Sequence, residues 1–150
     1  MDYKLLNEQL KALAEGVPNK VSVLANAAAL LFNELDEVNW TGFYIAEGDV
    51  LWLGPFMGKP ACVSIPFGKG VCGTAAVTDK TQLVPYVHNF AGHIVCDIAS
   101  NAEIVIPLHD HGRIYGVLDV DSHLPGRFTA EDREGLELFA RTLEKALFGD

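Results

Sequence analysis

The chain has 150 residues, of which 49% are hydrophobic and 21% are charged, and its formal net charge is −9. This length and composition predict a single soluble globular domain over residues 1–150 and exclude disordered and collagen-like proteins. The excess of acidic residues, without any run of Lys or Arg, excludes the usual nucleic-acid-binding proteins. The longest apolar stretch, residues 27–32, is far shorter than the roughly 20 residues of a membrane-spanning helix.

Two features of the sequence bear on its cellular compartment. The first residues lack the basic start, apolar core and small-residue cleavage site of a signal peptide, which predicts a cytoplasmic protein. The cysteines, Cys62, Cys72 and Cys96, are odd in number. In a reducing compartment they indicate thiol chemistry, metal binding or burial rather than a framework of structural disulfides.

Apolar side chains near the N-terminus recur at the spacing of amphipathic helices. A short helix is expected over residues 3–15, and a second helix is expected after Pro18 and Asn19, which suit a helix start. The buried face of the second helix is predicted from steps of three and four residues: Val21, Leu24, Ala28, Leu31 and Leu35.

From residue 39 onward the pattern changes to the two-residue period of β-strands. Residues 39–46 and 50–57 predict a hairpin. The segment 55–101 is rich in glycine and proline and is mostly predicted to be loop, which in a compact domain of this size is usually functional. Short elements are expected within it at three places: strands near residues 61–65 and 82–85, and a helix after Cys72.

Residues 102–109 and 113–121 predict a second hairpin. Its loop has three residues and ends in Gly112, which matches a type I turn followed by a left-handed Gly bulge. The register that this loop sets places Glu103 directly opposite Asp119. Because like charges opposite each other destabilise a sheet, this pairing indicates a functional reason for the carboxylates.

The same register predicts two faces of different character. One face is aliphatic and is expected to pack against the terminal helices: Ile104, Ile106, Leu108, Ile114, Gly116, Leu118 and Val120. The other face is mixed: Glu103, Val105, Pro107, Tyr115, Val117, Asp119 and Asp121.

The last predicted element is a C-terminal helix. Thr129 can cap it, with Asp132 three residues further on in the manner of a capping box, and Gly149 ends it. Its buried stripe is predicted to be Leu136, Phe139, Leu143 and Leu147.

The cysteines suggest reversible thiol redox chemistry. Cys72 lies at the start of a predicted helix, where the helix dipole and free amides lower the pKa of a thiol. Cys96 follows His93, whose imidazolium would favour the thiolate, while Asp97 would oppose it. One thiol would attack and another would resolve the resulting sulfenic acid as a disulfide. Simple burial is the alternative for each cysteine, since free Cys is among the most buried residue types.

Zinc is a competing interpretation of the same segment. Suitable ligand types are present at Cys62, Cys72, His88, His93 and Cys96. However, no CxxC pair occurs, and spacings of ten and twenty-four residues match no common structural zinc pattern. We therefore expect no bound metal.

The carboxylates and the tryptophans are further candidate site residues. Glu103, Asp119 and Asp121 would bind a cation or an ammonium group, although a divalent metal and a solvated strand face are alternatives. Trp40 and Trp52 are expected in the core, with an aromatic wall around an alkyl or sulfur-containing ligand as the alternative.

Five stretches together resemble the free methionine-(R)-sulfoxide reductases, a catalytic branch of the GAF-domain superfamily. The combination of PACxxIPxGKGVCG, GHIxCD and GVLDxDS is far more specific than a general GAF match. Tyr86, Ala91 and Ala102 depart from the usual family residues at positions that are expected to surround the lid. The five stretches are NWTGFYI (39–45), LGPFMGKPACVSIPFGKGVCGTA (53–75), VHNFAGHIVCDIASNAEIVIPL (87–108), GVLDVDS (116–122) and RFTAEDREGLE (127–137).

The resemblance implies an α+β fold with a central antiparallel β-sheet. The N- and C-terminal helices would pack on one face, and a ligand pocket would lie under a long loop on the other. It also implies an enzyme that reduces free L-methionine (R)-S-oxide to L-methionine, with thioredoxin as external reductant and no bound cofactor. By superfamily analogy, a homodimer would form through the terminal helices.

The resemblance also implies roles for individual residues. Cys96 would attack the sulfoxide sulfur and Cys62 would resolve the sulfenic acid, while Cys72 stays an alternative as attacking thiol or disulfide relay. The residues implied for substrate binding are Glu103, Asp119, Asp121, Trp40, Tyr44 and Asp97. The rival class is a non-catalytic GAF sensor of a nucleotide or small metabolite, which would explain neither the thiols nor a carboxylate triad that repels phosphate.

Overall fold

The computed structural model describes residues 1–92 and 100–149. Its helices are α1 (Tyr3–Ala14), α2 (Lys20–Glu34), α3 (Gly70–Thr78) and α4 (Ala130–Phe148), together with a 3₁₀ turn, η1 (Val87–Asn89). Its strands are β1 (Trp40–Glu47), β2 (Val50–Gly58), β3 (Ser64–Pro66), β4 (Gln82–Val84), β5 (Ala102–Asp110) and β6 (Arg113–Ser122).

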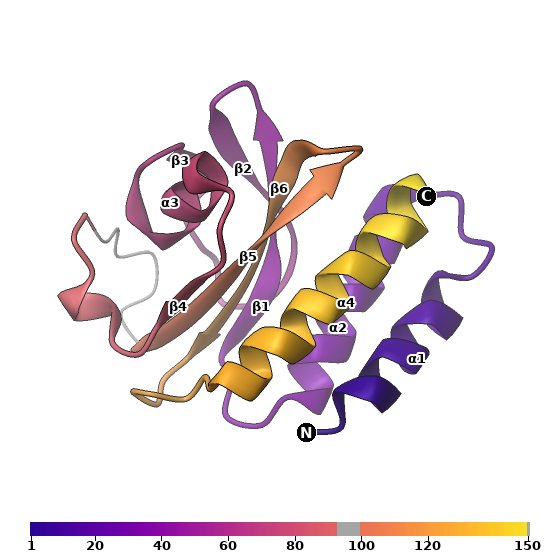
Figure 1. Cartoon of the computed structure of the whole chain (residues 1–150), viewed down its shortest axis with the longest axis horizontal. Helices are drawn as coiled ribbons and strands as arrows, with labels where there is room; N and C mark the ends of the chain where they lie inside the picture. The colour runs from indigo at the N-terminus through magenta and orange to yellow at the C-terminus, as the bar shows by residue number, and fades with distance from the viewer. Residues whose placement is uncertain (93–99, 150) are drawn as a thin grey trace.

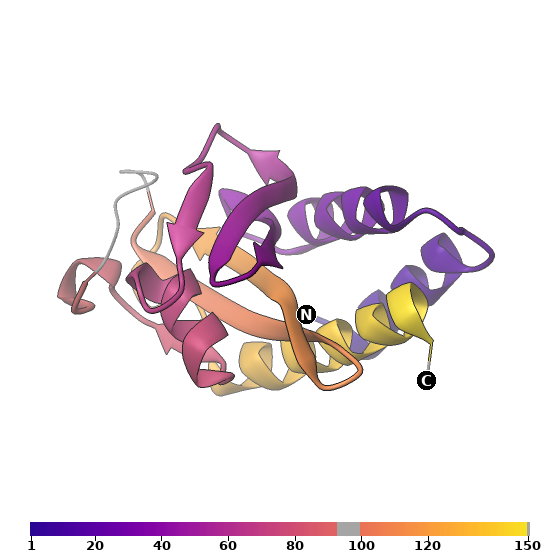
Figure 2. The same ribbon diagram turned by 90° about the horizontal axis from the view of Figure 1, so that it is seen from above.

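The strands form one sheet in the order β3-β2-β1-β6-β5-β4, and neighbouring strands are antiparallel. Figure 1 shows α1, α2 and α4 packed together on one side of this sheet and α3 on the opposite side. Figure 2 shows from above that α3 lies apart from the three terminal helices. This arrangement confirms the predicted α+β fold with terminal helices on one face.

The helix ends follow the local sequence closely. The Asn19 side chain accepts a hydrogen bond from the Ser22 amide at 3.0 Å and caps α2. Thr129 and Asp132 form the predicted capping box of α4, which ends at Gly149. None of the described helices is both long and apolar enough to cross a membrane.

The sheet divides the interior into two cores. The helix-side core lies between the sheet and α1, α2 and α4, and includes Leu6, Leu24, Leu31, Phe43, Ile104, Leu118 and Phe139. The site-side core lies on the α3 face and consists of Trp40, Tyr44, Leu51, Ile65, Val71, Cys72, Ala75, Ala76, Val84, Val87, Val105 and Val117. The predicted buried faces of α2 and α4 are confirmed, except that Val21 is 64% exposed and Leu147 is only partly buried.

The turn between β5 and β6 differs from the prediction. Asp110 pairs with Arg113, so the turn has two central residues rather than three. These residues, His111 and Gly112, have φ values of 49° and 86°. Positive φ at both central positions is what a two-residue hairpin turn of type I′ requires, and the backbone twist of this turn matches the twist of the flanking strands.

An irregularity between Leu108 and His109 shifts the rest of the hairpin. As a result Glu103 lies opposite Asp121, and the predicted pairing of Glu103 with Asp119 is wrong. The observed register differs from the predicted one by two residues, and side chains alternate between faces with a period of two. The three carboxylates therefore still share one face.

Two residues at this irregularity have exchanged faces. Ile114 packs against the site-side core, although it was predicted to face the terminal helices. Tyr115 packs against the helix-side core instead, with its ring edge-on to Phe148 at a centroid distance of 4.8 Å. A bulge inserts one residue and so reverses the alternation locally, which a regular pattern of residues does not predict.

Candidate functional site

Three buried carboxylates lie on the α3 face of the sheet. Glu103 and Asp121 are directly opposite each other on β5 and β6, and Asp119 lies two residues before Asp121 on the same strand. Their side chains are only 8%, 9% and 5% exposed, respectively. The middle strands of the sheet therefore hold three acids in the interior, where the charged form of a carboxyl group is costly.

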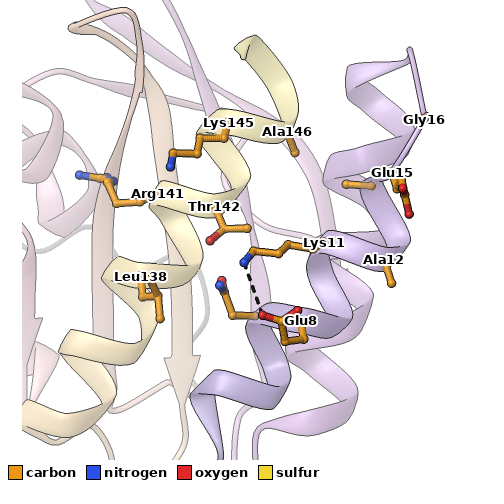
Figure 3. Close-up of a pocket in the computed structure, with 12 residues that line it drawn as sticks. Glu8, Lys11, Ala12, Glu15, Gly16, Leu138, Arg141, Thr142, Lys145 and Ala146 are labelled. Atoms are coloured by element: carbon orange, nitrogen blue, oxygen red, sulfur yellow. Dashed lines mark hydrogen bonds and ion pairs between the residues drawn. The ribbon is translucent and has the colours of Figure 1, made fainter. Parts of the chain in front are cut away.

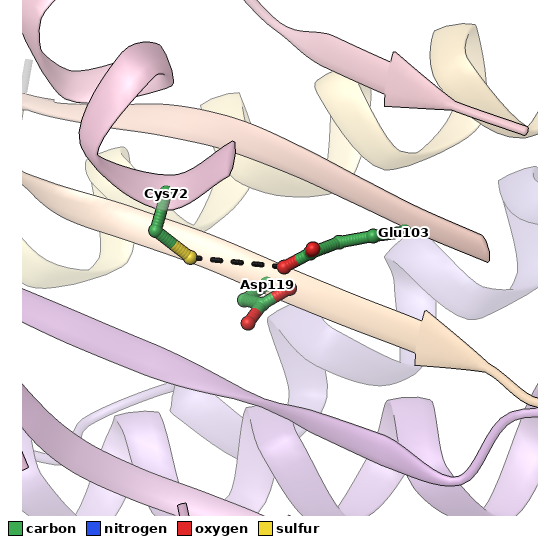
Figure 4. Close-up of side chains that lie close together, drawn as sticks. All are labelled: Cys72, Glu103 and Asp119. Atoms are coloured by element: carbon green, nitrogen blue, oxygen red, sulfur yellow. Dashed lines mark hydrogen bonds between the residues drawn. The ribbon is translucent and has the colours of Figure 1, made fainter. Parts of the chain in front are cut away.

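A thiol approaches this group from the opposite layer. Cys72 is the third residue of α3 and is only 4% exposed, and its Sγ lies 3.9 Å from Oε2 of Glu103. Ligand atoms of Cys72, Glu103 and Asp119 all lie within 4.8 Å of one another. Figure 4 shows the three side chains pointing toward one another from α3 and the two strands. We call these residues, with Asp121, the thiol–carboxylate cluster.

The environment of Cys72 overturns the prediction of an acidified thiol. Burial raises the pKa of Cys72 well above its ordinary value, and the charges of Asp119, Glu103 and Asp121 raise it further. The helix start is as predicted, but it does not lower the pKa because the thiol points away from solvent and toward acids. The sequence pattern indicated the helix and not the neighbours across it.

The pKa of the Asp119 carboxyl group is strongly shifted by its surroundings. Burial raises the pKa of this carboxyl well above its ordinary value, and Asp121 and Glu103 raise it further. Its Oδ1 atom has no hydrogen-bond partner among the described residues. Asp119 is thus suited to keep its proton at pH values where an ordinary Asp has lost it, and to donate this proton to a group that enters the site.

Aromatic rings line the cluster on the β1 side. Trp40 lies opposite Asp121, and its ring stacks on Phe56 and on Tyr44 at centroid distances of 5.2 and 6.0 Å. The Trp40 indole N–H donates to the Lys59 carbonyl at 3.1 Å, which fixes the ring. The aromatic wall is therefore built from Trp40, Tyr44 and Phe56.

Trp52 does not belong to this wall. It is 43% exposed, so its predicted place in the core is wrong. Trp52 and Trp40 both lie at even positions of the first hairpin, but the register shift between Gly42 and Tyr44 and the twist of the strands place them in different surroundings.

Cys62 is joined to the cluster through Tyr44. The Tyr44 hydroxyl donates a hydrogen bond to the Cys62 carbonyl at 2.9 Å, and Cys62 packs against the site-side core. Burial raises the pKa of Tyr44, and Asp119 adds to the shift, so this hydroxyl stays protonated as a donor. Cys62 is disulfide-bonded, whereas Cys72 is a free thiol.

The remaining predicted residues are placed as follows. Cys96 and Asp97, together with the zinc candidate His93, lie outside the described residues. His88, another zinc candidate, is exposed and contacts the edge of the Tyr86 ring. The predicted zinc set is therefore not brought together by its described members.

Two of the three departures from the family pattern lie on the protein surface. Tyr86 is 40% exposed, and Ala91 is also exposed. Ala102, however, is fully buried in the helix-side core, opposite Ser122. Its side chain thus faces the terminal helices, whereas those of Glu103 and Val105 face α3, because odd and even positions of β5 face opposite sides of the sheet.

Sequence reasoning missed a glycine that makes the aromatic wall possible. Gly42 lies beside Asp119 on the neighbouring strand, and a Cβ atom there would come within 2.3 Å of the Phe56 Cβ and 2.8 Å of the Trp40 ring. A glycine in the middle of a strand indicates such a close approach, and this signal is visible in the sequence.

A second missed group ties α3 to the helix layer. His109 Nε2 lies 2.6 Å from Asp79 at the end of α3, and Nδ1 lies 2.7 Å from Glu144 on α4. The imidazole therefore links the helix that carries Cys72 to the helix on the other side of the sheet. No spacing rule predicts this contact, because its residues are 30 and 35 positions apart.

The groove between α1 and α4 is a separate feature. It has a volume of about 810 Å³ and is crossed by the Glu8–Lys11 ion pair at 3.4 Å, as Figure 3 shows. Its lining contains no cysteine, histidine or aromatic side chain. It therefore lacks the groups needed for thiol chemistry.

This fold and its site define the class of protein. The GAF domain family model matches residues 12–147, so the chain belongs to the GAF domain family. Within that family, the free methionine-R-sulfoxide reductase of Escherichia coli (strain K12) is 52% identical over 145 residues, which cover 97% of this chain and 88% of that protein.

Solved structures agree with the sequence comparison. The reduced form of fRMsr of Staphylococcus aureus matches with a TM-score of 0.94 at 48% identity, covering 97% of this chain and 95% of that one. The free methionine-R-sulfoxide reductase of Neisseria meningitidis, in complex with its substrate, matches with a TM-score of 0.92 at 39% identity, covering 97% and 87%. The chain belongs to the free methionine-R-sulfoxide reductase family of GAF domain proteins.

Proposed function

We propose that this protein reduces free L-methionine (R)-S-oxide to L-methionine at the thiol–carboxylate cluster. The observation that carries the proposal is the buried Cys72 thiol within 4.8 Å of Glu103 and Asp119, on the face opposite the terminal helices. Its likeness to free methionine-R-sulfoxide reductases at about half identity over nearly the full chain supports the same reaction.

The reaction needs two thiols and a proton donor. An attacking thiolate takes the sulfoxide oxygen as its own hydroxyl, which gives a sulfenic acid and releases the thioether. A second thiol then attacks the sulfenic sulfur, so that a disulfide forms and water leaves. The substrate sulfur gains two electrons, and the two cysteine sulfurs lose one each.

Asp119 is proposed to supply the proton to the sulfoxide oxygen. The carboxyl group has a raised pKa, and its Oδ1 lacks a hydrogen-bond partner among the residues that the structure describes. A general acid in the right position contributes roughly 10²–10⁴-fold in rate. Protonation of the oxygen makes the sulfoxide sulfur more electrophilic toward the thiolate. The oxygen then ends as the hydroxyl group of the sulfenic acid while the thioether is released.

Glu103 and Asp121 are proposed to bind the ammonium group of the substrate. They face each other across β5 and β6 beside Asp119, in a buried and strongly anionic setting. A cation that enters there relieves their mutual repulsion and forms charge-assisted hydrogen bonds. Trp40 and Tyr44 would pack against the aliphatic and sulfur-containing part of the molecule.

The cysteines are assigned as in the related family. Cys96 is proposed to attack with Asp97 positioning it, and Cys62 is proposed to resolve the sulfenic acid. The disulfide state of Cys62 supports a redox role, and the raised pKa of Cys72 argues against a resting thiolate at that position. Cys72 stays the alternative as attacking thiol or disulfide relay.

The proposal also includes the location of the enzyme, its reductant and its oligomeric state. A cytoplasmic location suits a reversible disulfide, and thioredoxin would return it to the dithiol state. Exposed Leu5, Leu13 and Leu138 on α1 and α4 would be covered in a homodimer formed through the terminal helices. Analytical ultracentrifugation tests the dimer, and a dithiol such as dithiothreitol in place of thioredoxin tests the reductant.

A non-catalytic GAF sensor is the competing class. Its usual anionic ligands would be repelled by three buried carboxylates. The deciding experiment incubates the protein with racemic free methionine sulfoxide, thioredoxin, thioredoxin reductase and NADPH. The proposal expects NADPH oxidation that stops when about half of the sulfoxide is consumed. No oxidation above the protein-free control would contradict it.

A further inference from the structure

Cys72, Glu103 and Asp119 of the thiol–carboxylate cluster present potential metal-ligand atoms close to one another. They come from three different elements, Cys72 from α3, Glu103 from β5 and Asp119 from β6, and their ligand atoms lie within 4.8 Å of one another. All three residues are buried, and Asp119 is only 5% exposed. Its Oδ1 is buried and has no hydrogen-bond partner among the described residues, which marks a place for a ligand.

We propose that the reduced protein binds one Zn²⁺ ion reversibly through Cys72, Glu103 and Asp119, and that the bound ion blocks the site. The first part stands on the geometry of the cluster. The second part rests on the proposed function, because it requires the substrate to occupy the same place.

The spacing suits zinc in particular. With Zn–S near 2.3 Å and Zn–O near 2.1 Å, a tetrahedral ion separates sulfur and oxygen ligands by about 3.6 Å. The Cys72 Sγ and Glu103 Oε2 atoms are already 3.9 Å apart, so a small side-chain adjustment suffices. A single thiolate favours a borderline-soft ion such as Zn²⁺ or Co²⁺ over Mg²⁺ and Ca²⁺, which prefer oxygen ligands alone.

The charge of the cluster also favours a divalent cation. Glu103 and Asp119 lie close to the Cys72 thiol in the interior, and among the described residues neither of these two acids forms an ion pair with a Lys or Arg side chain. An ion of charge +2 offsets this repulsion directly. Only three protein ligands are present, so the fourth position stays open, as in zinc sites that exchange ligands.

The occupied site cannot act as a reductase site. Coordination would engage the Asp119 and Glu103 oxygens that the proposed reaction uses for proton donation and ammonium binding. A metal ion and free methionine sulfoxide would therefore exclude each other. Binding of zinc would be a reversible inhibition, distinct from a resident metal that the fold needs.

Cobalt gives a direct optical readout that does not depend on activity. Anaerobic, fully reduced protein is titrated with Co²⁺ while the near-ultraviolet thiolate-to-cobalt charge-transfer band is recorded. A Cys62→Ser/Cys96→Ser double variant keeps Cys72 as its single thiol and removes the other candidate ligands. We expect this variant to show the band, to saturate at one ion per chain, and to lose the band when Zn²⁺ is added.

Variants of the ligands locate the ion. Cys72→Ser should abolish the band in the background of the double variant, and Glu103→Gln and Asp119→Asn should each weaken Co²⁺ binding at least tenfold. Asp49→Asn, an exposed acid in the turn of the first hairpin, is the matched control and should bind as before. No band in the double variant, or equal binding by Asp49→Asn and both ligand variants, would overturn the site.

Competition separates this inference from the proposed function. Free methionine sulfoxide should displace Co²⁺ from the double variant, whereas N-acetyl-methionine sulfoxide should displace it at least tenfold less effectively. A band that the free sulfoxide does not displace would overturn the shared site. The NADPH assay without added metal judges the proposed function independently of either result.

Discussion

Asp119 and Asp132 are two buried aspartates on opposite sides of the sheet, with exposed fractions of 5% and 7%. Asp132 accepts hydrogen bonds from the Tyr3 hydroxyl at 2.6 Å, the Thr129 amide at 2.9 Å and Arg127 at 3.1 Å. These partners lower its pKa below the ordinary value despite its burial. Asp119 faces two further acids and a thiol, and its pKa is raised.

The opposite pKa shifts of Asp119 and Asp132 distinguish a buried carboxylate that stabilises the fold from one that serves a reaction or a ligand. A buried carboxylate that serves the fold receives donors for both oxygens, as Asp132 does at the start of α4. A buried carboxyl group without such donors destabilises the folded protein and persists where a ligand or a reaction uses it. Asp119 is therefore expected to matter for activity and Asp132 for stability.

The largest expected effect concerns the cysteines to which the proposed reaction assigns attack and resolution. We expect Cys96→Ser to form no methionine even in a single turnover, and Cys62→Ser to form about one methionine per chain and then stall. Chromatographic quantification of methionine, with enzyme in excess and no reductant, measures both. Full single turnover by Cys96→Ser, with none by Cys72→Ser, would transfer the attack to Cys72.

The acids around Asp119 should also decide which sulfoxide is used. An acetylated amine has no charge, and a charge-assisted hydrogen bond to an ammonium group is worth roughly 1.5–3 kcal/mol. We expect N-acetyl-methionine sulfoxide to be reduced with a kcat/KM at least tenfold lower than that of the free amino acid. Glu103→Gln and Asp121→Asn should each narrow this gap while lowering kcat/KM for the free substrate. Comparable turnover of both sulfoxides by the wild type would contradict the ammonium site.

The two aspartates should give stability opposite dependences on pH. The folded protein holds the Asp119 proton above the ordinary Asp pKa of 3.8, where the unfolded chain releases it. The free energy of unfolding should therefore fall as pH rises from 3.8 through the raised pKa of Asp119. Asp132 has a lowered pKa, so its contribution is present above 3.8 and is lost as pH falls below that value.

Urea unfolding across this pH range measures both slopes. Asp119→Asn should flatten the decline on the alkaline side, and Asp132→Asn should flatten the loss on the acid side. The same slope in wild type and Asp119→Asn would show that Asp119 is not the group that titrates.

The smallest expected effect is the cost of weakening the α4 cap. Asp132→Asn should lower stability by about 1–2 kcal/mol, since it disturbs the capping box and the charged hydrogen bonds from Tyr3 and Arg127. For a domain of this size the melting temperature should fall by roughly 2–4 °C per kcal/mol. Thermal denaturation followed by circular dichroism checks this, with the exposed Glu131→Gln as control.

Most of the fold could be predicted because its signals are local. Helix caps such as Asn19 and Thr129 and the alternation along β5 and β6 depend on residues close in sequence. The register of the second hairpin could not be predicted, because the choice between a three-residue loop and a tight turn with a bulge depends on packing of the whole sheet. Ile114 and Tyr115 changed faces for this reason.

The candidate site was predictable in its residue types but not in its electrostatics. The shared face of Glu103, Asp119 and Asp121 follows from strand alternation and tolerates a register error of two residues. The approach of Cys72 to those acids joins segments at least 31 positions apart and reverses the expected direction of its pKa shift. Sequence spacing contains no information about such contacts between layers.

The most direct test of this account is a paired measurement of activity and stability in Asp119→Asn and Asp132→Asn. Each kcat/KM for free methionine (R)-S-oxide is corrected for the folded fraction, which circular dichroism gives at the assay temperature. We predict that Asp119→Asn loses at least 100-fold in kcat/KM without losing stability, as expected for removal of a general acid. Asp132→Asn should stay within twofold of wild type per folded molecule while melting at a lower temperature. An Asp119→Asn variant that keeps more than a tenth of the wild-type kcat/KM would contradict the account.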